Sequence, residues 1–428
     1  MSFLSTLIAQ LIVILALSRA VGWLFRRIHQ PQVMGEMVAG ILLGPSLLGW
    51  IAPGISLALF PSDSLGFLNS LSQIGLVLFM FLVGLELDPN LLRGRGRATF
   101  LISTVSITLP FILGISLALY LYPRLSDENV RFAYFALFLG TAMSITAFPV
   151  LARILGERKM LGTNVGSVSI ACAAINDVAG WIILAVVVLL VRRSEADIPL
   201  WTILTGVLIY MGLMLFGVRR LLNHLEALYL RRGDITQGIL AIILLVVLAS
   251  SWVTENLGIH ALFGAFLAGV VMPRHHSFAQ TLTVKLHDVT VVLLLPLFFA
   301  YTGLRTSIGL VDGARLWFYT GLIVAIAIAG KFGGTAIAAR LSGMPLREAG
   351  ALGILMNTRG LMELVLLNIG LEIGVISPVL FSMLVFMALF TTFMTAPMLE
   401  WVYFTRMFPG KYETVDTQPQ DITPDFLG

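Results

Sequence analysis

The stretch LGTAMSITAFPVLARIL, residues 139–155, lies inside a long apolar segment but does not have the sequence of an uninterrupted membrane helix. Small and polar residues gather at its centre together with a proline: Gly140, Thr141, Ser144, Thr146 and Pro149. A second stretch, LGILMNTRGLMELVLLNIG, residues 352–370, has a similar centre: Asn357, Thr358, Arg359 and Gly360. These centres predict two interrupted helices, and the alternative is that glycine and proline only kink ordinary ones.

The composition determines the class of protein to which these stretches belong. The chain has 58% hydrophobic and 12% charged residues and a mean hydropathy of +0.95, which excludes a water-soluble protein. Its apolar runs are long and continuous, without the two-residue alternation of barrel strands. We therefore expect an all-α polytopic membrane protein. The single cysteine, Cys172, excludes an internal disulfide and is expected to serve packing.

About 20 apolar residues cross a bilayer as a helix. The sequence contains about thirteen such segments, of which the ninth is short: 3–25, 31–50, 65–87, 97–122, 131–153, 160–191, 199–220, 234–257, 258–273, 281–304, 314–340, 346–371 and 376–405. The first run has no basic segment before it and no small-residue cleavage site after it. We expect it to be a retained span rather than a signal peptide.

The positions of Lys and Arg predict the orientation of these spans. If the N-terminus lies outside, the interior loops and the tail contain 18 of the 27 Lys and Arg residues and the exterior loops contain six. The positive-inside rule therefore predicts that the N-terminus is outside and the C-terminus is cytoplasmic, in the inner membrane if the protein is bacterial. The net charge of +4 is explained by basic loops facing anionic lipid, and no nucleic-acid partner is expected.

Thirteen spans divide into two sets of six around a lone seventh. The halves, about 1–191 and 234–405, then have opposite topology, and helix 199–220 links them. The two interrupted segments are the fifth of each set, as in inverted-repeat transporters whose broken helices build a binding site near the midplane. Residues 1–405 would form this membrane domain and 406–428 a short cytoplasmic tail.

Charged residues at membrane depth cost at least roughly 2.5 kcal/mol each on insertion scales, so each is a functional candidate. Four lie well inside predicted spans: Asp177, Lys331, Arg359 and Glu363. Asp177 follows a run of small residues and should face the bundle, where a carboxylate can exchange a proton for a metal cation. Asn176 adds an amide oxygen that suits an alkali ion but carries no proton. The alternative role for Asp177 is a structural ion pair or hydrogen bond.

The other three buried charges have less defined roles. A buried lysine must pair or lose its proton, and the expected acidic partner of Lys331 is Asp177. Arg359 and Glu363 are four residues apart and share a helix face, where they either cap the unwound segment or take part in transport. Further charged residues lie nearer span ends, where side chains reach the interface: Arg19, Glu36, Glu86 and Asp88.

Several histidines border the ninth span: His260, His275, His276 and His287. They are either pH-sensing or ordinary interfacial residues. The sequence has no P-loop, no zinc-ligand spacing and no GxGxxG after a strand. It therefore indicates neither an enzyme nor a resident cofactor.

Seven stretches, in order between about residues 31 and 400, resemble the monovalent cation:proton antiporter-2 family. They are PQVMGEMVAGILLGPSLLG, FLVGLELD, AMSITAFPVLARIL, AAINDVAGWIILA, GIHALFGAFLAGVVMP, FFAYTGLRTSIG and NTRGLMELVLLNIG. The similarity is greatest to the plant and fungal cation/proton exchanger branch and its bacterial relatives. It implies a homodimeric antiporter with a dimerisation domain and a mobile six-helix core, in which two broken helices cross beside the ion site and an elevator-like shift alternates access.

The resemblance also implies roles for individual residues. Asp177 would bind the cation or the proton, Asn176 would be its neighbour, and Lys331 would be the core lysine. Thr146 and adjacent polar groups such as Ser144 would be the contribution of the broken fifth helix. Electrogenic relatives have two adjacent aspartates where this chain has Asn-Asp, so the stoichiometry cannot be transferred. Potassium-efflux relatives have a cytosolic nucleotide-binding domain, whereas this chain ends soon after its last span.

Taken together, the sequence predicts an antiporter that exchanges Na⁺ or K⁺ for H⁺ by competition at Asp177. One alternative is a cation channel, although no ring-forming filter sequence is present and an intramembrane lysine would obstruct cations. Another is a membrane sensor or scaffold without transport, in which costly buried charges would have no use. Ligand types alone do not distinguish Na⁺ from K⁺, since both take oxygen ligands.

Overall fold

The computed structural model describes residues 3–86, 96–160, 163–193, 200–273 and 276–404. These residues are almost entirely helical and contain no strand, as the sequence predicts. The predicted tail, 406–428, lies outside the described residues, as do Asp88 and His275.

Within the described residues, eleven helices are long and apolar enough to cross a membrane, or up to twelve when one bent pair is counted as a span. The chain is thus an integral, multi-pass membrane protein, but the count of thirteen spans is not confirmed. The predicted segment 258–273 forms α13 (Ala261–Val270), which has ten residues. At 1.5 Å per residue this helix is about 15 Å long, half the thickness of the hydrocarbon core.

One group of helices, here called the first bundle, packs mainly within itself and contains α13. Its other members are α1 (Phe3–Arg27), α2 (Gln32–Leu43), α3 (Leu48–Ile51), α4 (Pro53–Leu59), α5 (Ser62–Glu86), α12 (Gln237–Asn256), α14 (His276–Asp288), the π-helical turn Val289–Leu294 and α15 (Leu295–Arg305). Glycines bring α2 and α15 into backbone contact, since a Cβ on Gly303 would lie 2.0 Å from the carbonyl carbon of Gly40.

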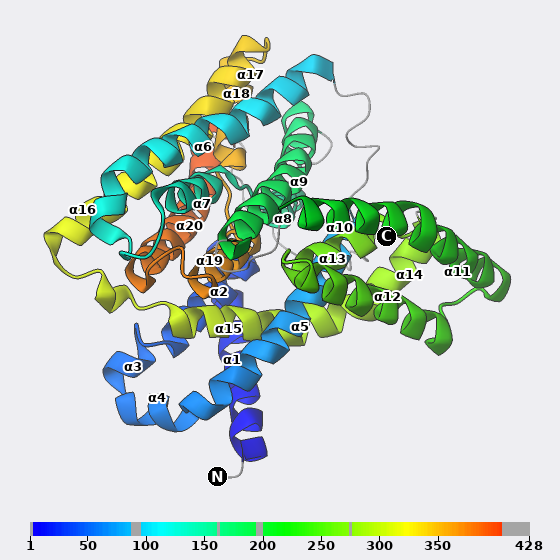
Figure 1. Cartoon of the computed structure of the whole chain (residues 1–428). Helices are drawn as coiled ribbons and strands as arrows, with labels where there is room; N and C mark the ends of the chain where they lie inside the picture. Colours follow the sequence, from blue (N-terminus) through cyan, green and yellow to red (C-terminus); the bar gives the residue numbers. More distant parts are fainter. Residues whose placement is uncertain (1–2, 87–95, 161–162, 194–199, 274–275, 405–428) are drawn as a thin grey trace, which may run out of the picture.

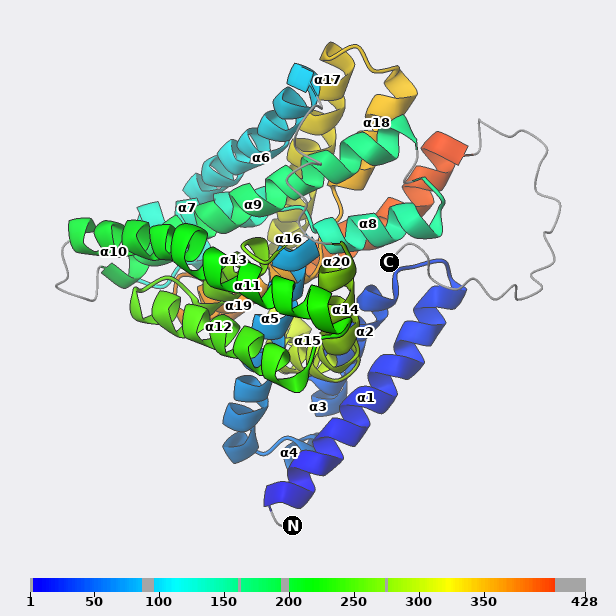
Figure 2. The ribbon, with the colours of Figure 1, turned by 90° about the vertical axis from the view of Figure 1, so that its right-hand side faces the viewer.

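The remaining spans form the second bundle, in the upper part of Figure 1. They are α6 (Gly96–Leu125), α7 (Phe132–Ser144), α8 (Phe148–Glu157), α9 (Asn164–Arg193), α16 (Gly313–Ile328), the π-helical turn Ala329–Gly333, α17 (Gly334–Leu341), α18 (Leu346–Met356), α19 (Leu361–Glu372), α20 (Pro378–Leu399) and the π-helical turn Glu400–Phe404. Figure 2 shows α6, α17 and α18 on the side opposite α1, α3 and α4.

The segment between the two halves is longer than predicted. It comprises α10 (Leu200–Gly212), a π-helical turn (Leu213–Val218) and α11 (Arg219–Arg232), so the helix continues twelve residues beyond the expected end at 220. The reason is that leucines recur at helical spacing among the basic residues of α11, and the helix ends only where Gly233 adopts a φ of +76°. The segment joins the first bundle, where the hydroxyls of Tyr210 and Ser250 lie 2.6 Å apart.

Specific contacts connect the two bundles. The Asn368 amide of α19 donates to Thr302 Oγ1 of α15 at 2.9 Å, and Arg305 at the end of α15 lies 3.2 Å from Glu372. Gln30, between α1 and α2, donates to the Phe393 carbonyl of α20 at 3.1 Å. Helices make more contacts within each bundle than between the bundles, although one cluster of buried apolar side chains includes residues of both.

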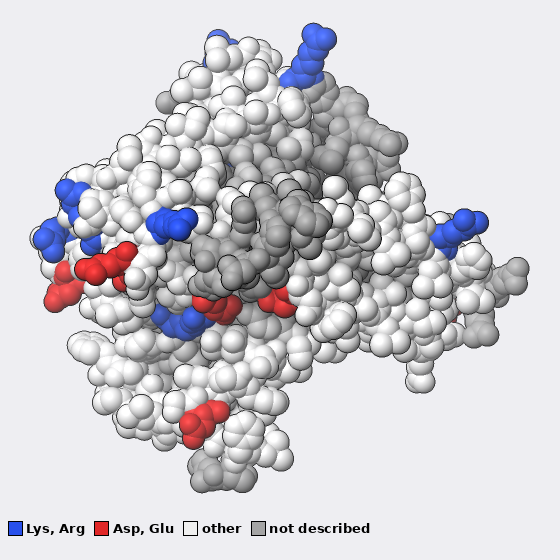
Figure 3. All heavy atoms as spheres, in the orientation of Figure 1, with Lys and Arg blue, Asp and Glu red and all other residues white. Residues whose placement is uncertain are grey.

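The outer surface has the character of a membrane protein. Figure 3 shows a face on which most atoms belong to uncharged residues and the charged side chains form a few separate patches. Large apolar side chains are widely exposed, with Trp50, Phe216 and Leu341 each at 79%. In a bilayer these side chains contact lipid tails, whereas contact with water would be unfavourable.

Candidate functional site

The first interrupted helix breaks between α7 and α8. Residues 145–147 separate them, and Ile145 and Ala147 have extended backbone. Pro149 lies in the first turn of α8, where its missing N–H is not needed. The predicted interruption is therefore confirmed, and it leaves the last carbonyls of α7 and the first N–H groups of α8 without helical partners at membrane depth.

The second interrupted helix breaks between α18 and α19, whose axes are inclined by 42°. The two breaks touch each other. The Ala147 N–H donates to the Thr358 carbonyl at 3.0 Å, and Thr146 Oγ1 donates to the Met356 carbonyl at 3.0 Å. A Cβ on Gly360 would lie 2.7 Å from a methyl carbon of Val150, so this approach requires glycine. The crossing of two broken helices predicted from the sequence is present.

Asp177 lies beside this crossing, in the middle of α9 and only 2% exposed. Its Oδ1 accepts a long hydrogen bond, 3.5 Å, from the N–H of Phe148, the first residue of α8. Its Oδ2 has no protein hydrogen-bond partner. The positive end of the α8 dipole thus faces a carboxylate with one oxygen still available for a cation or a proton.

Asn176 faces α6 and the first break. Its side chain lies 2.8 Å from Ser106 Oγ and 3.3 Å from Thr146 Oγ1. The amide satisfies both of its ends when its oxygen faces Lys331, because the oxygen then accepts from Lys331 Nζ at 3.2 Å and the nitrogen donates to the Cys172 carbonyl at 3.2 Å. Asn176 therefore connects α6, the broken helix and the buried lysine.

Lys331 is fully buried, but the ion pairs of the described residues do not include one with Asp177. The expectation of a direct pair is wrong. The ammonium instead donates to the Ser106 carbonyl at 2.9 Å and to the carbonyl of Ser144, the last residue of α7. With Asn176 these acceptors match its three N–H donors. Backbone carbonyls, rather than the predicted carboxylate, therefore accept the hydrogen bonds of the lysine.

Arg359 and Glu363 are fully buried and paired at 2.9 Å. The guanidinium of Arg359 also donates to the Met143 carbonyl at 2.8 Å and to the Ala142 carbonyl. The arginine therefore caps the carboxyl end of α7, which belongs to the other broken helix, while Glu363 lies in the first turn of α19. Of the two roles left open by the sequence, the geometry favours neutralising and capping the interrupted segments.

Some residues of this region were not found from the sequence. Ser106 of α6 contacts both Asn176 and Lys331, and Thr392 of α20 exchanges hydrogen bonds with the backbone of Arg359 at 2.8 and 2.7 Å. Neither has a distinctive motif. Glu36, expected near the interface, is buried in α2 at 3% exposure with Gln32 as a hydrogen-bond partner at 3.0 Å.

Two of the four histidines, His260 and His287, have described side chains, and neither contacts the crossing. His260 precedes α13, and its ring accepts from the Leu262 N–H at 3.5 Å, as an N-cap does. His287 lies beside Asp288 at 3.4 Å on the exposed surface of α14. For these two residues, the interfacial role is the better interpretation.

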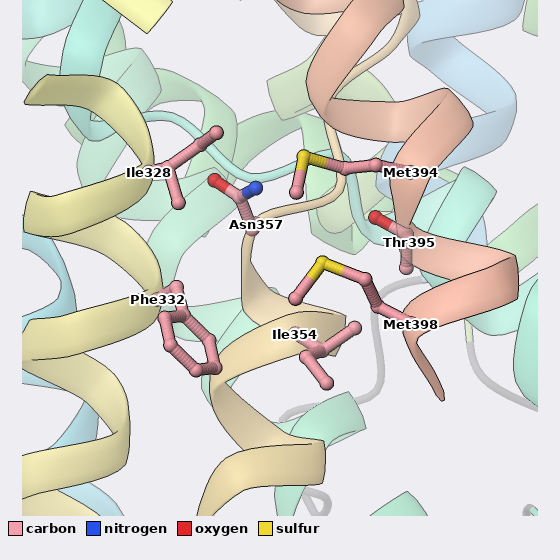
Figure 4. A pocket seen from close by; sticks show the side chains of 7 residues that line it. All are labelled: Ile328, Phe332, Ile354, Asn357, Met394, Thr395 and Met398. Atoms are coloured by element: carbon pink, nitrogen blue, oxygen red, sulfur yellow. The ribbon is translucent and has the colours of Figure 1, made fainter. Parts of the chain in front are cut away.

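A small pocket borders the second break on another side. Figure 4 shows Asn357 pointing into it among apolar side chains, including Phe332, Met394 and Met398. The side-chain amide oxygen of Asn357, Oδ1, has no protein partner, and Asp177 does not line the pocket. The pocket is therefore adjacent to the crossing but separate from the carboxylate.

Comparison with known proteins agrees with this geometry. Residues 12–403 match the family described as the sodium/hydrogen exchanger, transmembrane. The chain belongs to this family. It is 43% identical over 398 residues to the Na(+)/H(+) antiporter NhaS4 of Synechocystis sp., covering 93% of this chain and 97% of that one.

Two less similar relatives are longer than this chain. The chain is 42% identical to cation/H(+) antiporter 17 of Arabidopsis thaliana and 33% identical to K(+)/H(+) antiporter 1 of Saccharomyces cerevisiae, covering 95% and 93% of itself. It spans 49% and 46% of these two relatives, about half their length. The structure of the sodium proton antiporter MjNhaP1 from Methanocaldococcus jannaschii matches with a TM-score of 0.64 at 15% identity, over 94% of this chain and 99% of that one, which shows the shared fold.

Proposed function

We propose that the protein exchanges a monovalent cation, Na⁺ or K⁺, for H⁺ across a membrane, and that Asp177 carries either the cation or the proton. The observation that carries this proposal is the position of Asp177. It is a buried carboxylate at the crossing of two broken helices, with Oδ2 uncommitted and Oδ1 facing the α8 N-terminus. Relatives described as Na⁺/H⁺ and K⁺/H⁺ antiporters support the same chemistry.

The surroundings of Asp177 suit an alkali cation. The side chains of Asn176 and Thr146 and the carbonyls of the breaks have neutral oxygens, which alkali ions accept as ligands, and a bound cation would replace some of the hydrogen bonds that these oxygens now make. The α8 amide stabilises the carboxylate when it is ionised. A cation and a proton both need the same anionic oxygen, so each displaces the other, and this competition couples the two fluxes.

Alternating access follows from the two bundles. We propose that the second bundle carries Asp177 past the first in an elevator-like movement, while two copies of the chain join through their first bundles as a homodimer. The localised contacts between the bundles support this division. The proposed orientation places the N-terminus outside and the C-terminus in the cytoplasm, because the basic loops then lie inside.

The contacts of Lys331 bear on the stoichiometry. An ammonium group with an oxygen acceptor for each N–H is expected to keep its proton through the cycle, and Asn176 has none to give. One carboxylate then exchanges one proton for one cation, and exchange is electroneutral. In reconstituted vesicles without ion gradients, an imposed membrane potential should drive no net proton movement. Potential-driven proton flux would instead identify Lys331 as a second carrier.

The central test is Asp177→Asn, which keeps the shape of the side chain but removes its charge and its proton. We expect purified, folded protein in proteoliposomes to lose cation-driven proton flux for Na⁺ and for K⁺. Retained flux would refute the role of Asp177. A flux that persists without a counter-gradient and does not saturate would indicate a channel.

Asp234→Asn is the matched control. The hydrogen bond from Lys285, together with the Ile235 N–H, holds the pKa of the exposed Asp234 carboxyl below its ordinary value. This carboxyl therefore stays ionised between about pH 6 and 9, and its contribution to stability is lost only as the pH falls through the lowered pKa. We expect normal exchange and a normal pH profile for this variant.

A further inference from the structure

Helix α6 contains two internal prolines, Pro110 and Pro123. A proline has no backbone N–H, so the carbonyl four residues before it loses its usual helical donor. For Pro110 this carbonyl belongs to Ser106. In the hydrocarbon region such a carbonyl needs another partner, because water is not available to supply one.

The partner of the Ser106 carbonyl is Lys331, whose Nζ donates to it at 2.9 Å. The two helices touch at this level. A Cβ on Gly330 would lie 3.0 Å from Pro110 Cα, so the glycine before the lysine packs directly on the proline. Lys331 itself lies in the π-helical turn Ala329–Gly333, an irregular turn of the kind often found at functional sites. The proline and the π-helical turn thus meet where the lysine binds its acceptor.

The same arrangement occurs a second time in this chain. Pro397 lies inside α20, and the carbonyl four residues before it belongs to Phe393. That carbonyl accepts a hydrogen bond from the Gln30 side chain at 3.1 Å. In both places, a long polar side chain from a distant segment binds the carbonyl whose helical donor a proline has removed.

We propose that Pro110 is a positioning residue for Lys331. By leaving the Ser106 carbonyl without its helical donor, it provides one of the acceptors that hold the ammonium beside Asn176 and away from a direct pair with Asp177. This inference rests on the proposed function, because the position of Lys331 matters through its effect on the exchange of cation and proton at Asp177.

The perturbation is Pro110→Ala, which restores a backbone N–H that competes for the Ser106 carbonyl. We expect the midpoint of the pH profile of exchange to shift by about one pH unit, the size expected when a charged group loses one hydrogen bond. Pro123→Ala is the matched control. Pro123 lies near the end of the same helix, and the carbonyl four residues before it belongs to Leu119, which is exposed and far in sequence from the Ser106 carbonyl that binds Lys331. This control should leave the pH profile unchanged.

A thermal double-mutant cycle tests the mechanism without using transport. The melting temperature of the detergent-solubilised protein is measured for Pro110→Ala, Lys331→Met and the double variant. We expect Pro110→Ala to lower it clearly when Lys331 is present and by less than half as much in the Lys331→Met background. If Pro110→Ala does not fold alone, a folded double variant supports the proposal, and an unfolded one contradicts it.

Equal losses in both backgrounds together with an unchanged pH profile would overturn the inference, since the proline would then only shape α6. Failure of the proposed function has a different signature. In that case Asp177→Asn would retain exchange, whereas the coupling between Pro110 and Lys331 in the melting cycle would be unaffected.

Discussion

Arg359→Met is expected to destabilise the second bundle strongly. The arginine is fully buried and binds Glu363 and the Met143 and Ala142 carbonyls, and methionine can replace none of these contacts. Removing one member of a buried ion pair typically costs about 3–5 kcal/mol, because the other charge remains buried without a partner. We expect the free energy of unfolding to fall by this amount and the melting temperature to fall clearly. The melting temperature is measured on the detergent-solubilised protein by size-exclusion chromatography after heating.

The double variant Arg359→Met/Glu363→Leu separates the two functions of the arginine. It no longer contains an unpaired carboxylate, so only the uncapped end of α7 remains, at about 1–3 kcal/mol. Its melting temperature should therefore lie between those of the wild type and Arg359→Met. A double variant less stable than Arg359→Met would refute the argument that the unpaired Glu363 accounts for most of the loss.

The chain provides a matched control in Arg153→Met. Arg153 and Glu157 are also four residues apart and 3.0 Å from each other, but their side chains are 37% and 45% exposed. A solvent-accessible pair of this kind contributes about 0–1 kcal/mol. If Arg359→Met lowered the melting temperature no more than Arg153→Met does, burial would not be the reason for the strength of the Arg359 interaction.

Two further predictions concern the bundles. Gly303→Ala should separate α2 from α15 and lower the melting temperature, because its Cβ would lie 2.0 Å from the Gly40 backbone. The control Gly321→Ala should leave the melting temperature unchanged, because there is open space where its Cβ would lie. The pair Thr302→Cys/Asn368→Cys joins α15 to α19 and should block exchange when oxidised and restore it when reduced, since these side chains are 2.9 Å apart across the bundles. Undiminished exchange by the oxidised, cross-linked protein would argue against relative movement at this contact.

The interruptions of the helices could be predicted from the sequence because side chains mark them. Pro149 and Gly360 are poor residues for a continuous helix, and both lie at or next to the observed breaks. Charge in an apolar segment likewise identified Asp177 and the ion pair of Arg359 with Glu363. Each of these signals belongs to the residue itself, so no knowledge of its neighbours was required.

The partner of Lys331 could not be predicted in the same way. Its acceptors include the carbonyls of Ser106 and Ser144, which every residue type has and which become available only through a proline and a break elsewhere. In the sequence, Pro110 was the one local indication that the Ser106 carbonyl would be available as an acceptor. Glu36 was misjudged for a related reason, since its distance from the end of a span did not show that neighbouring helices cover it.

Five charged side chains are buried in the described part of the chain, and the four other than Glu36 are best understood from the helix ends that surround them. The carboxyl end of α7 is negative and binds the cations of Lys331 and Arg359, while the first turn of α19 is positive and contains Glu363. These three residues therefore balance charges that the broken helices create. Glu363 also has an oxygen without a protein partner, Oε1, but its other oxygen is paired with Arg359. Asp177 has only a 3.5 Å contact with the α8 N-terminus, an oxygen without a protein partner, and no ion pair among the described residues. Of the four, it is the charge that the fold leaves available for exchange.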